Sequence, residues 1–255
     1  MLHGFTGSSD TWEALSGHLA HRHEVFALDM PGHGRSSAPA DAARYSLDRF
    51  AADLACVLDV VSLQKVAVLG YSMGGRAAIQ FALAHGDRVA ALILESTSPG
   101  IPDTVEREAR LAADAELASM IERDGVAAFV DRWERLPLWE SQSALPDSAR
   151  EKLRLQRLAN RPDGLANSLR GAGAGSSVPV TGRLASIAAP ALVVAGALDA
   201  KYVGLAPLLV ASLPDARLDI IPGAGHAVHL EQPDALARSA GDFLRRVPIA
   251  GSRWL

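Results

Sequence analysis

Short apolar runs alternate with longer amphipathic stretches along most of the 255-residue chain. The apolar runs, rich in Val, Ile, Leu and Ala, predict strands at 23–29, 65–70, 89–95, 191–196 and 216–221. Apolar positions at a spacing of three and four predict helices at 10–20, 47–61, 72–84, 201–212 and 232–246. Because most of the strands are apolar on both faces, we expect an α/β fold with a mostly parallel central sheet covered by helices on both faces.

The alternation of strand and helix patterns stops between about residues 99 and 190. Only helical patterns occur there, at 103–124, 125–135, 146–160 and 163–171, before a return through "GAGAGSSVP" at 171–179. We therefore expect an α/β core built from 1–98 and 180–255, with 99–179 inserted after a mid-sheet strand as a helical lid. Such an insertion would cover the carboxyl ends of the strands, where open α/β sheets bind ligands.

Composition narrows the class of protein. With 49 % hydrophobic residues the chain can bury a large core, and a formal net charge of −4 gives no reason to expect nucleic acid as a partner. No apolar run approaches the length of a membrane span, and the sequence shows no secretory signal, so the expected compartment is the cytoplasm. Cys56 is the single cysteine, and no Cys/His cluster predicts a metal site.

The stretch Gly70-Tyr71-Ser72-Met73-Gly74 fits the pattern G-x-S-x-G. "KVAVL" precedes it and a predicted helix follows, which is the strand–turn–helix context of a nucleophile elbow. The glycines permit a tight turn, and the helix N-terminus favours developing negative charge. A glycine-rich turn with a solvated serine is the alternative, and the context favours Ser72 as the reactive hydroxyl.

A serine hydroxyl needs a base, and an imidazole base needs an orienting acid. His226 lies in "IIPGAGHAVHL", in a loop after a predicted strand; His229, three residues on, is its rival. Asp199 in "VVAGALDAKY" completes the chain order Ser, Asp, His. An N-cap role for Asp199 ahead of the next helix is equally sound chemically, and position and order favour the triad.

An oxyanion hole requires two backbone N–H groups aimed at developing negative charge. Met73, directly after the nucleophile, is expected to provide one. Phe5, in "LHGFTGS", is expected to provide the other. We assign structural roles to His3, and to Asp29 and His33 of "DMPGHGRS".

Arg76 is the only formally charged residue of "VLGYSMGGRAAIQFALAH", a helix otherwise apolar nearly all round. One interpretation is a structural salt bridge with Glu95, at the end of the neighbouring strand. The other is a substrate carboxylate held by two parallel hydrogen bonds. The residues alone do not separate these alternatives.

Taken together, these motifs resemble the α/β-hydrolase superfamily over nearly the whole chain. More narrowly, the sequence is similar to the 2-succinyl-6-hydroxy-2,4-cyclohexadiene-1-carboxylate (SHCHC) synthases of menaquinone biosynthesis. The narrower resemblance rests on "LHGFTGSSDTW", "DMPGHGRS", "GYSMGGR", "ESTSPGI", "EREARLAAD", "FVDRWERLPLW", "RLQRLAN", "LANSLRGAGAG" and "GALDAKY".

The resemblance implies that Arg76, with Arg110 and Arg157 of the lid, binds substrate carboxylates. It also implies that Trp133 faces the pocket and that Tyr71 lies beside the nucleophile. The family reaction is a carbon–oxygen elimination that releases pyruvate without a cofactor, with the triad as general base. The implied partner is a small molecule with several carboxylates, bound without membrane or nucleic acid.

Two other functions use the same residues. A serine hydrolase acting on an ester or a carbon–carbon bond would need an identical triad, and a non-catalytic binding protein could keep the fold. Family members also carry opening strands before the His-Gly motif, whereas only Met1 and Leu2 precede His3 here. The N-terminal strands of the family are therefore expected to be missing from this sequence. Either its start lies too far downstream, or the protein lacks an edge of its sheet, and in the second case Phe5 would be less firmly held.

Overall fold

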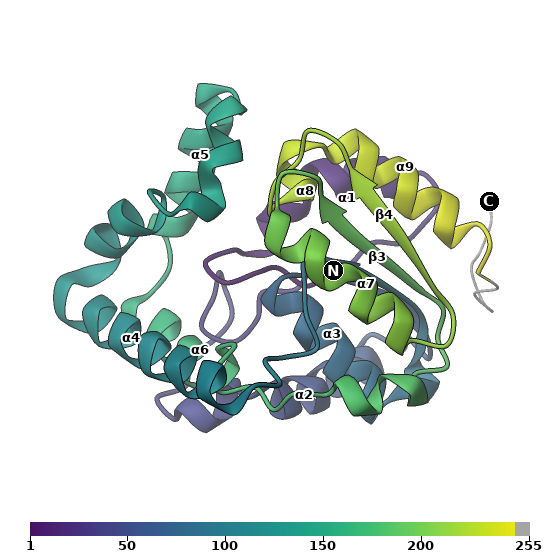
Figure 1. Cartoon of the computed structure of the whole chain (residues 1–255), viewed down its shortest axis with the longest axis horizontal. Coiled ribbons are helices and arrows are strands. Elements are labelled where there is room, and N and C mark those ends of the chain that lie inside the picture. Colours follow the sequence, from purple (N-terminus) through teal and green to yellow (C-terminus); the bar gives the residue numbers. More distant parts are fainter. Residues whose placement is uncertain (248–255) are drawn as a thin grey trace.

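The computed structural model describes residues 1–247; the tail 248–255, which the sequence analysis included in the core, lies outside the described residues. Four parallel strands form one sheet, in the order in which they occur in the chain (Figure 1). They are β1 (Val66–Tyr71), β2 (Val89–Glu95), β3 (Ala191–Gly196) and β4 (Ala216–Ile221). All residues of β2 and β3 are buried, as expected for central strands covered on both faces. Four of the five predicted strands are thus confirmed.

The fifth prediction, a strand at 23–29, is wrong. In this segment Leu28 forms an isolated parallel bridge with Leu2, and Leu2 bridges in turn to Gly70 of β1. The Leu28 N–H donates to the Met1 carbonyl at 3.1 Å, and the Leu2 N–H donates to the Leu69 carbonyl at 2.8 Å. The segment runs beside the sheet but pairs only with Met1 and Leu2, too short a partner for a continuous ladder.

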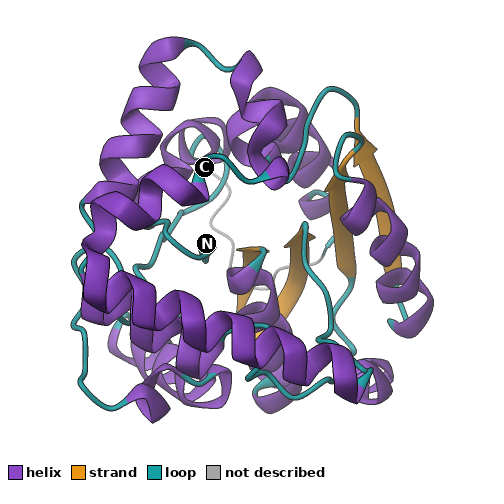
Figure 2. Ribbon diagram, turned by 60° about the vertical axis from the view of Figure 1, so that its left-hand side comes forward, coloured by secondary structure: helices purple, strands orange, loops and turns teal. Residues whose placement is uncertain are grey.

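Helices cover both faces of the sheet (Figure 2). On one face, α2 (Leu47–Val60), α3 (Met73–Ala84) and α7 (Ala200–Ser212) contribute to one hydrophobic cluster with the strands. On the other, α1 (Glu13–Leu19), α8 (Val228–Glu231) and α9 (Pro233–Leu244) pack in a second cluster. Short 3-10 turns complete the core: η1 (Ser9–Trp12), η2 (Ala42–Tyr45), η3 (Gly86–Arg88) and η5 (Thr181–Ser186).

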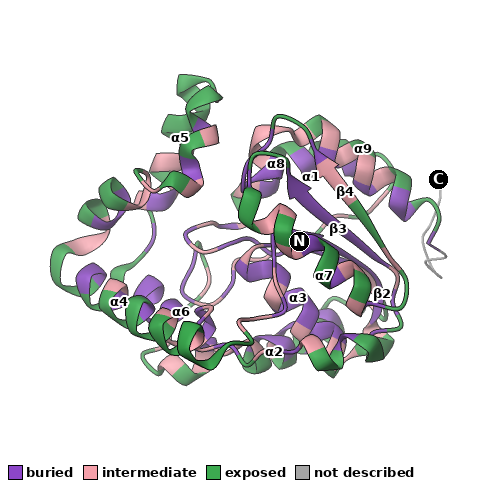
Figure 3. Cartoon of the chain, viewed as in Figure 1, coloured by how far each residue is buried: buried purple, intermediate pink, exposed green. Residues whose placement is uncertain are grey.

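The helices between β2 and β3 stand apart from the sheet (Figure 1). They are α4 (Thr104–Trp133), η4 (Pro137–Ala144), α5 (Asp147–Leu158) and α6 (Pro162–Ala172). Two helices were predicted within α4; Gly125, at φ 83° and ψ 169°, breaks the helical geometry between them. A third hydrophobic cluster joins α4 to α6, whereas α5 is largely exposed (Figure 3). None of the described helices is both long and apolar enough to cross a membrane.

Candidate active site

Ser72 occupies a strained turn between β1 and α3. Its backbone adopts φ 52° and ψ −109°, a region that residues with a side chain rarely enter. The Ser72 N–H donates to the Glu95 carbonyl at 2.9 Å, and the Thr97 hydroxyl donates to the Ser72 carbonyl at 2.8 Å. Residues at and just after the end of β2 therefore hold both the N–H and the carbonyl of the strained Ser72.

Glycines allow the segment that follows Leu2 to approach this turn closely. A Cβ atom on Gly74 would lie 2.2 Å from the Leu2 carbonyl oxygen, which is far inside contact distance. A Cβ on Gly4 would lie 2.6 Å from the Tyr71 ring. The G-x-S-x-G pattern and the His-Gly pair thus belong to one packed junction, at which the start of α3 rests on residues 2–4.

His226 connects Ser72 to Asp199. Its Nδ1 lies 2.7 Å from Asp199 Oδ2, and its Nε2 lies 3.1 Å from Ser72 Oγ. Because a carboxylate only accepts, the Nδ1–H donates to Asp199, and Nε2 is left to accept the Ser72 hydroxyl proton. The His226 and Asp199 residues are 3 % and 7 % exposed, so water competes little with either hydrogen bond.

Asp199 makes the contacts that both of its interpretations require. Its Oδ1 accepts from the Tyr202 N–H at 3.3 Å and caps α7, while its Oδ2 binds His226. The rival base, His229, points elsewhere: its Nδ1 lies 2.8 Å from Glu95 Oε1. The structure therefore brings Ser72, Asp199 and His226 together and places His229 in a separate pair.

The backbone N–H groups of Phe5 and Met73 have no hydrogen-bond acceptor among the described residues. Met73 begins α3, and both residues line the cavity described below. Donors left free beside a nucleophile are what an oxyanion hole requires. The geometry is compatible with the predicted pair.

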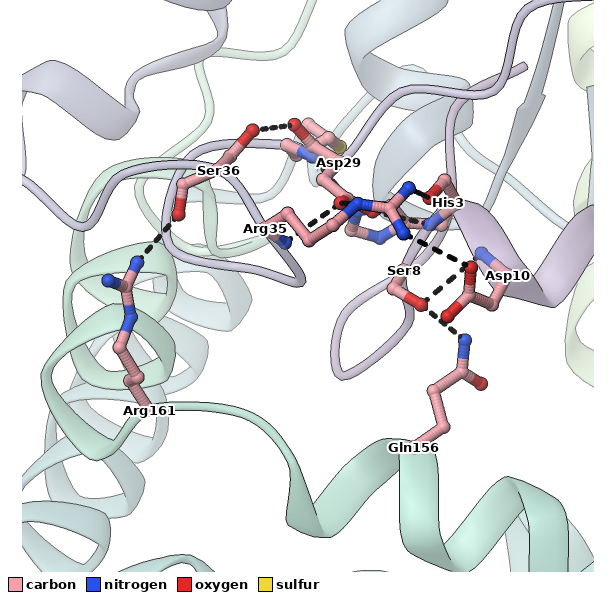
Figure 4. A network of polar contacts seen from close by, with 10 residues as sticks. His3, Ser8, Asp10, Asp29, Arg35, Ser36, Gln156 and Arg161 are labelled. Atoms are coloured by element: carbon pink, nitrogen blue, oxygen red, sulfur yellow. Dashed lines mark hydrogen bonds and ion pairs between the residues drawn. The ribbon is translucent and has the colours of Figure 1, made fainter.

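A polar network holds the loop that carries Phe5 (Figure 4). His3 Nε2 accepts from the Met30 N–H at 2.9 Å, and its Nδ1 donates to the Gly4 carbonyl at 2.7 Å. Both ring nitrogens are thus used by the neutral imidazole, and burial lowers the pKa of His3 to about 4. Asp29 accepts from the Ser9 N–H at 2.6 Å and the Arg35 N–H at 2.8 Å. These contacts agree with the structural roles predicted for His3 and Asp29.

A cavity of about 660 Å³ opens beside Ser72 and His226. Its wall is shared by the α/β core and by the helices inserted between β2 and β3. Among residues 1–247, four cationic side chains line it: Arg76, Arg110, Arg132 and Lys201. Three acidic side chains line it as well: Glu106, Asp114 and Glu116.

Arg76 does not form the salt bridge with Glu95 that the sequence left open. Its Nη2 donates to the Ala172 carbonyl at 2.8 Å, and its buried Nε has no hydrogen-bond partner among the described residues. Burial lowers the pKa of Arg76, and the nearby charge of Arg110 lowers it further. Arg110 itself binds Asp114 at 2.8 Å. Arg76 is a cation on the cavity wall with no carboxylate within ion-pair distance among the described residues.

Arg157 is not part of the cavity wall. Its guanidinium donates to Glu134 at 3.0 Å and to Gln142 at 3.2 Å, and it lies 5.2 Å from the centre of the Trp139 ring. Glu134 already neutralises the charge, so a substrate carboxylate would have to displace this partner. The structure brings two of the three predicted arginines to the cavity and places the third behind an aromatic side chain.

Both predicted aromatic residues, Trp133 and Tyr71, line the cavity. The Trp133 ring packs 5.5 Å from Phe5, and the buried Tyr71 ring lies 5.3 Å from His226. Burial, helped by the Glu95 carboxylate, raises the pKa of Tyr71 well above its usual range, so its hydroxyl stays neutral.

Sequence reasoning missed four further residues of the wall: Tyr202, Trp139, Lys201 and Arg132. The Tyr202 ring lies 4.7 Å from His226, and the Trp139 ring lies 5.6 Å from it. Lys201 and Tyr202 directly follow the capping turn of Asp199, a position that could have indicated them. Within residues 1–247, no group of three His, Cys, Asp or Glu side chains converges to hold a metal ion.

Comparison with known proteins agrees with this geometry. Residues 1–233 match the family described as alpha/beta hydrolase fold. A Bacillus subtilis (strain 168) protein, provisionally named as a 2-succinyl-6-hydroxy-2,4-cyclohexadiene-1-carboxylate synthase, is 42 % identical over 96 % of this chain and 89 % of its own. The Serratia proteamaculans (strain 568) protein with that synthase name is 31 % identical, over 95 % of this chain and 91 % of its own.

Among solved structures, MenH from S. aureus superposes with a TM-score of 0.92. It is 33 % identical to this chain, with 96 % of this chain and 91 % of that one covered. The agreement extends over the core and the inserted helices alike, because a match of that coverage includes both. The chain therefore belongs to the α/β-hydrolase fold family and, within it, to the family of the 2-succinyl-6-hydroxy-2,4-cyclohexadiene-1-carboxylate synthases.

Proposed function

We propose that this chain is a carbon–oxygen lyase of menaquinone biosynthesis. In this proposal it eliminates pyruvate from a succinyl-enolpyruvyl-hydroxycyclohexene-carboxylate and forms SHCHC. The observation that carries the proposal is the placement of a Ser–His–Asp array at a cavity whose wall holds cations, among them Arg76, which has no carboxylate partner among the described residues. The synthase name of the relatives supports the same substrate.

The array acts as a base. His226 Nε2 takes the Ser72 hydroxyl proton as Ser72 Oγ removes the proton from the ring carbon next to the succinyl carbonyl. Asp199 holds the imidazole in the required tautomer and stabilises its cation. The N–H groups of Phe5 and Met73 donate to the carbonyl oxygen as it becomes an enolate.

The elimination then conserves atoms and charge. As the enolate returns to a ketone, its electron pair moves through the ring double bond and forms the second double bond of the diene. The carbon–oxygen bond to the enolpyruvyl group breaks, and the departing enolpyruvate takes up a proton to become pyruvate. No water is consumed.

The cavity wall supports recognition of a molecule with three carboxylates. Arg76 and Arg110 offer guanidinium groups, and Arg132 and Lys201 add positive charge. Trp133 and Tyr71 supply apolar surface for the ring. In this arrangement Arg157 supports the wall by holding Trp139 in place rather than by touching the substrate directly.

The test is release of pyruvate from the enolpyruvyl substrate, followed with a coupled dehydrogenase. We expect Ser72→Ala and His226→Ala to lower kcat by at least about a thousandfold, because each removes part of the base. Arg76→Met should lower kcat/KM by about 10- to 150-fold, the equivalent of losing one charge-assisted hydrogen bond. The exposed Arg245, paired with Asp242, provides a matched control as Arg245→Met and should behave as wild type.

A serine hydrolase with the same triad is the competing function. If the wild type accumulates an acyl-enzyme with p-nitrophenyl esters and releases no pyruvate, the lyase proposal is wrong. Equal loss of ester and pyruvate reactions in Arg76→Met would also contradict the role of Arg76, because a neutral ester has no carboxylate for it to bind.

A further inference from the structure

The loop that carries His226 is held by a carboxylate of its own. Glu231, at the end of α8, accepts from the Gly225 N–H with Oε2 at 2.6 Å and from the Ala227 N–H with Oε1 at 3.2 Å. These two N–H groups flank His226 on either side. One side chain therefore fixes the peptide unit before Gly225 and the peptide unit after His226.

A second carboxylate holds the same loop three residues further on. Glu95 Oε1 accepts from the His229 N–H at 3.0 Å and from His229 Nδ1 at 2.8 Å. The side chains of Glu95 and His229 are at most 1 % exposed to solvent. The carbonyl of the same Glu95 accepts the Ser72 N–H at 2.9 Å. A single residue at the end of β2 thus ties the nucleophile turn to the imidazole loop.

Beside the His226–Asp199 bond, Glu231 satisfies the backbone of the loop on both sides of His226. Gly225 and Ala227 are buried, so their N–H groups depend on Glu231 for an acceptor. The loop also faces the inserted helices: a Cβ on Gly225 would lie 2.1 Å from Ser141 Oγ of η4. A small movement of this loop would lengthen the 3.1 Å contact between His226 and Ser72.

We propose that Glu231 and Glu95 are positioning residues that hold the loop 225–229 so that His226 bridges Ser72 and Asp199. The inference rests on the proposed base role of His226. Neither Glu231 nor Glu95 lines the cavity. Their effect is therefore expected in the turnover of bound substrate and not in its binding.

The two carboxylates should respond differently to the same isosteric change. Both oxygens of Glu231 accept, so Glu231→Gln would place an amide NH₂ against a backbone N–H. In Glu95 only Oε1 accepts, and Oε2 has no partner among the described residues. Glu95→Gln can keep both bonds through its single carbonyl oxygen, whereas Glu95→Leu cannot.

The experiment compares these variants in the 255-residue chain. Asp234→Asn is the control, because that exposed carboxylate lies just beyond the loop and pairs with His18. We expect Glu231→Gln and Glu95→Leu to lower kcat for pyruvate release by about 10- to 100-fold, with KM changed less than about threefold, as small misplacements of a catalytic group do. Glu95→Gln should recover most of the loss.

A second readout does not depend on the substrate. The His226 Nδ1 proton, hydrogen-bonded to Asp199, should give a low-field proton NMR signal that disappears in Asp199→Asn. We expect this signal to broaden or shift in Glu231→Gln and Glu95→Leu but not in Asp234→Asn. Thermal melting of each variant shows that it is folded at the assay temperature.

Several results would overturn the inference. These are a wild-type kcat and an unchanged low-field signal in Glu231→Gln, a rise in KM without a loss of kcat, or equal losses in Glu95→Gln and Glu95→Leu. If the wild-type protein released no pyruvate, the proposed function would fail, while the NMR comparison would still decide whether the carboxylates position His226.

Discussion

At the scale of single residues, two buried histidines beneath the Phe5 loop link stability to pH. His3 and His33 are fully buried, with ring centres 5.0 Å apart. Burial lowers the pKa of His3 to about 4, and burial together with the charge of His3 lowers that of His33 to about 3. Both are neutral in the folded protein, whereas in the unfolded chain they titrate near 6.5.

The sign of the pH effect follows from this difference. Between pH 6.5 and the folded pKa values, the unfolded chain binds more protons, so the free energy of unfolding falls as pH falls. Each histidine contributes a slope of about 1.4 kcal/mol per pH unit in this range. His33→Phe keeps a ring of similar size without a titrating nitrogen and should flatten the curve by about one such slope between pH 6 and pH 4. Urea unfolding at several pH values measures it, and parallel curves for the two proteins would contradict the assignment.

The positions of site residues that lie in a local sequence motif could be predicted. The partners of side chains that pair with residues far away in the sequence could not. Ser72 and His226 follow strands with glycines beside them, a pattern visible in the sequence. Arg157 also lies in a family-like motif. Its guanidinium nevertheless pairs with Glu134, 23 residues away in the sequence, and does not line the cavity. Glu95 was considered a partner for Arg76 and pairs with His229 instead. Side-chain pairs between residues that are far apart in the sequence produce no local sequence pattern.

At the scale of elements, the connection between α5 and α6 reaches onto the loop that carries Phe5. The Asn160 amide donates to the Thr6 carbonyl at 2.9 Å. The Gln156 amide, near the end of α5, lies 2.7 Å from Ser8 Oγ (Figure 4). Thr6 adopts φ 69°, a conformation that a threonine keeps only when its surroundings hold it. The inserted helices thus brace the loop of the proposed oxyanion hole.

Asn160→Ala should therefore reduce turnover by loosening this loop. We expect kcat to fall about 3- to 10-fold, which corresponds to the loss of about one hydrogen bond. Asn167→Ala is the matched control, since its amide donates to the carbonyls of Pro39 and Ala40, away from the loop. Steady-state pyruvate release compares them, and an equal effect of the two substitutions would argue against a specific role of Asn160.

Periodicity predicted most elements because most of them bury one face or both. It failed for segments whose conformation depends on the segments that they contact. The 23–29 run has a strand composition but pairs only with Met1 and Leu2. The 3-10 segment η4 was not predicted, because its eight residues have no helical period, although it carries Trp139 to the cavity.

At the scale of the whole molecule, the cavity lies between two parts of the chain, the α/β core and the helices inserted between β2 and β3. The core supplies Arg76, Tyr71 and Tyr202, and the inserted helices supply Arg110 and Trp133. The chain carries a formal net charge of −4, so attraction of an anion depends on the local cations and not on the total charge. A ligand that contacts both units should stabilise them together.

2-Succinylbenzoate, a stable aromatic diacid with the succinyl and ring carboxylates of SHCHC, tests this coupling. At a concentration of about 100 Kd it should stabilise the folded protein by about 2.7 kcal/mol. For a chain of this size that raises Tm by about 5–10 °C. Its dimethyl ester has the same ring but no charge, and we expect little shift because the cavity cations then lose their partners. An equal shift with the ester would mean that the cavity selects apolar surface, and the carboxylate recognition on which the lyase proposal depends would fail.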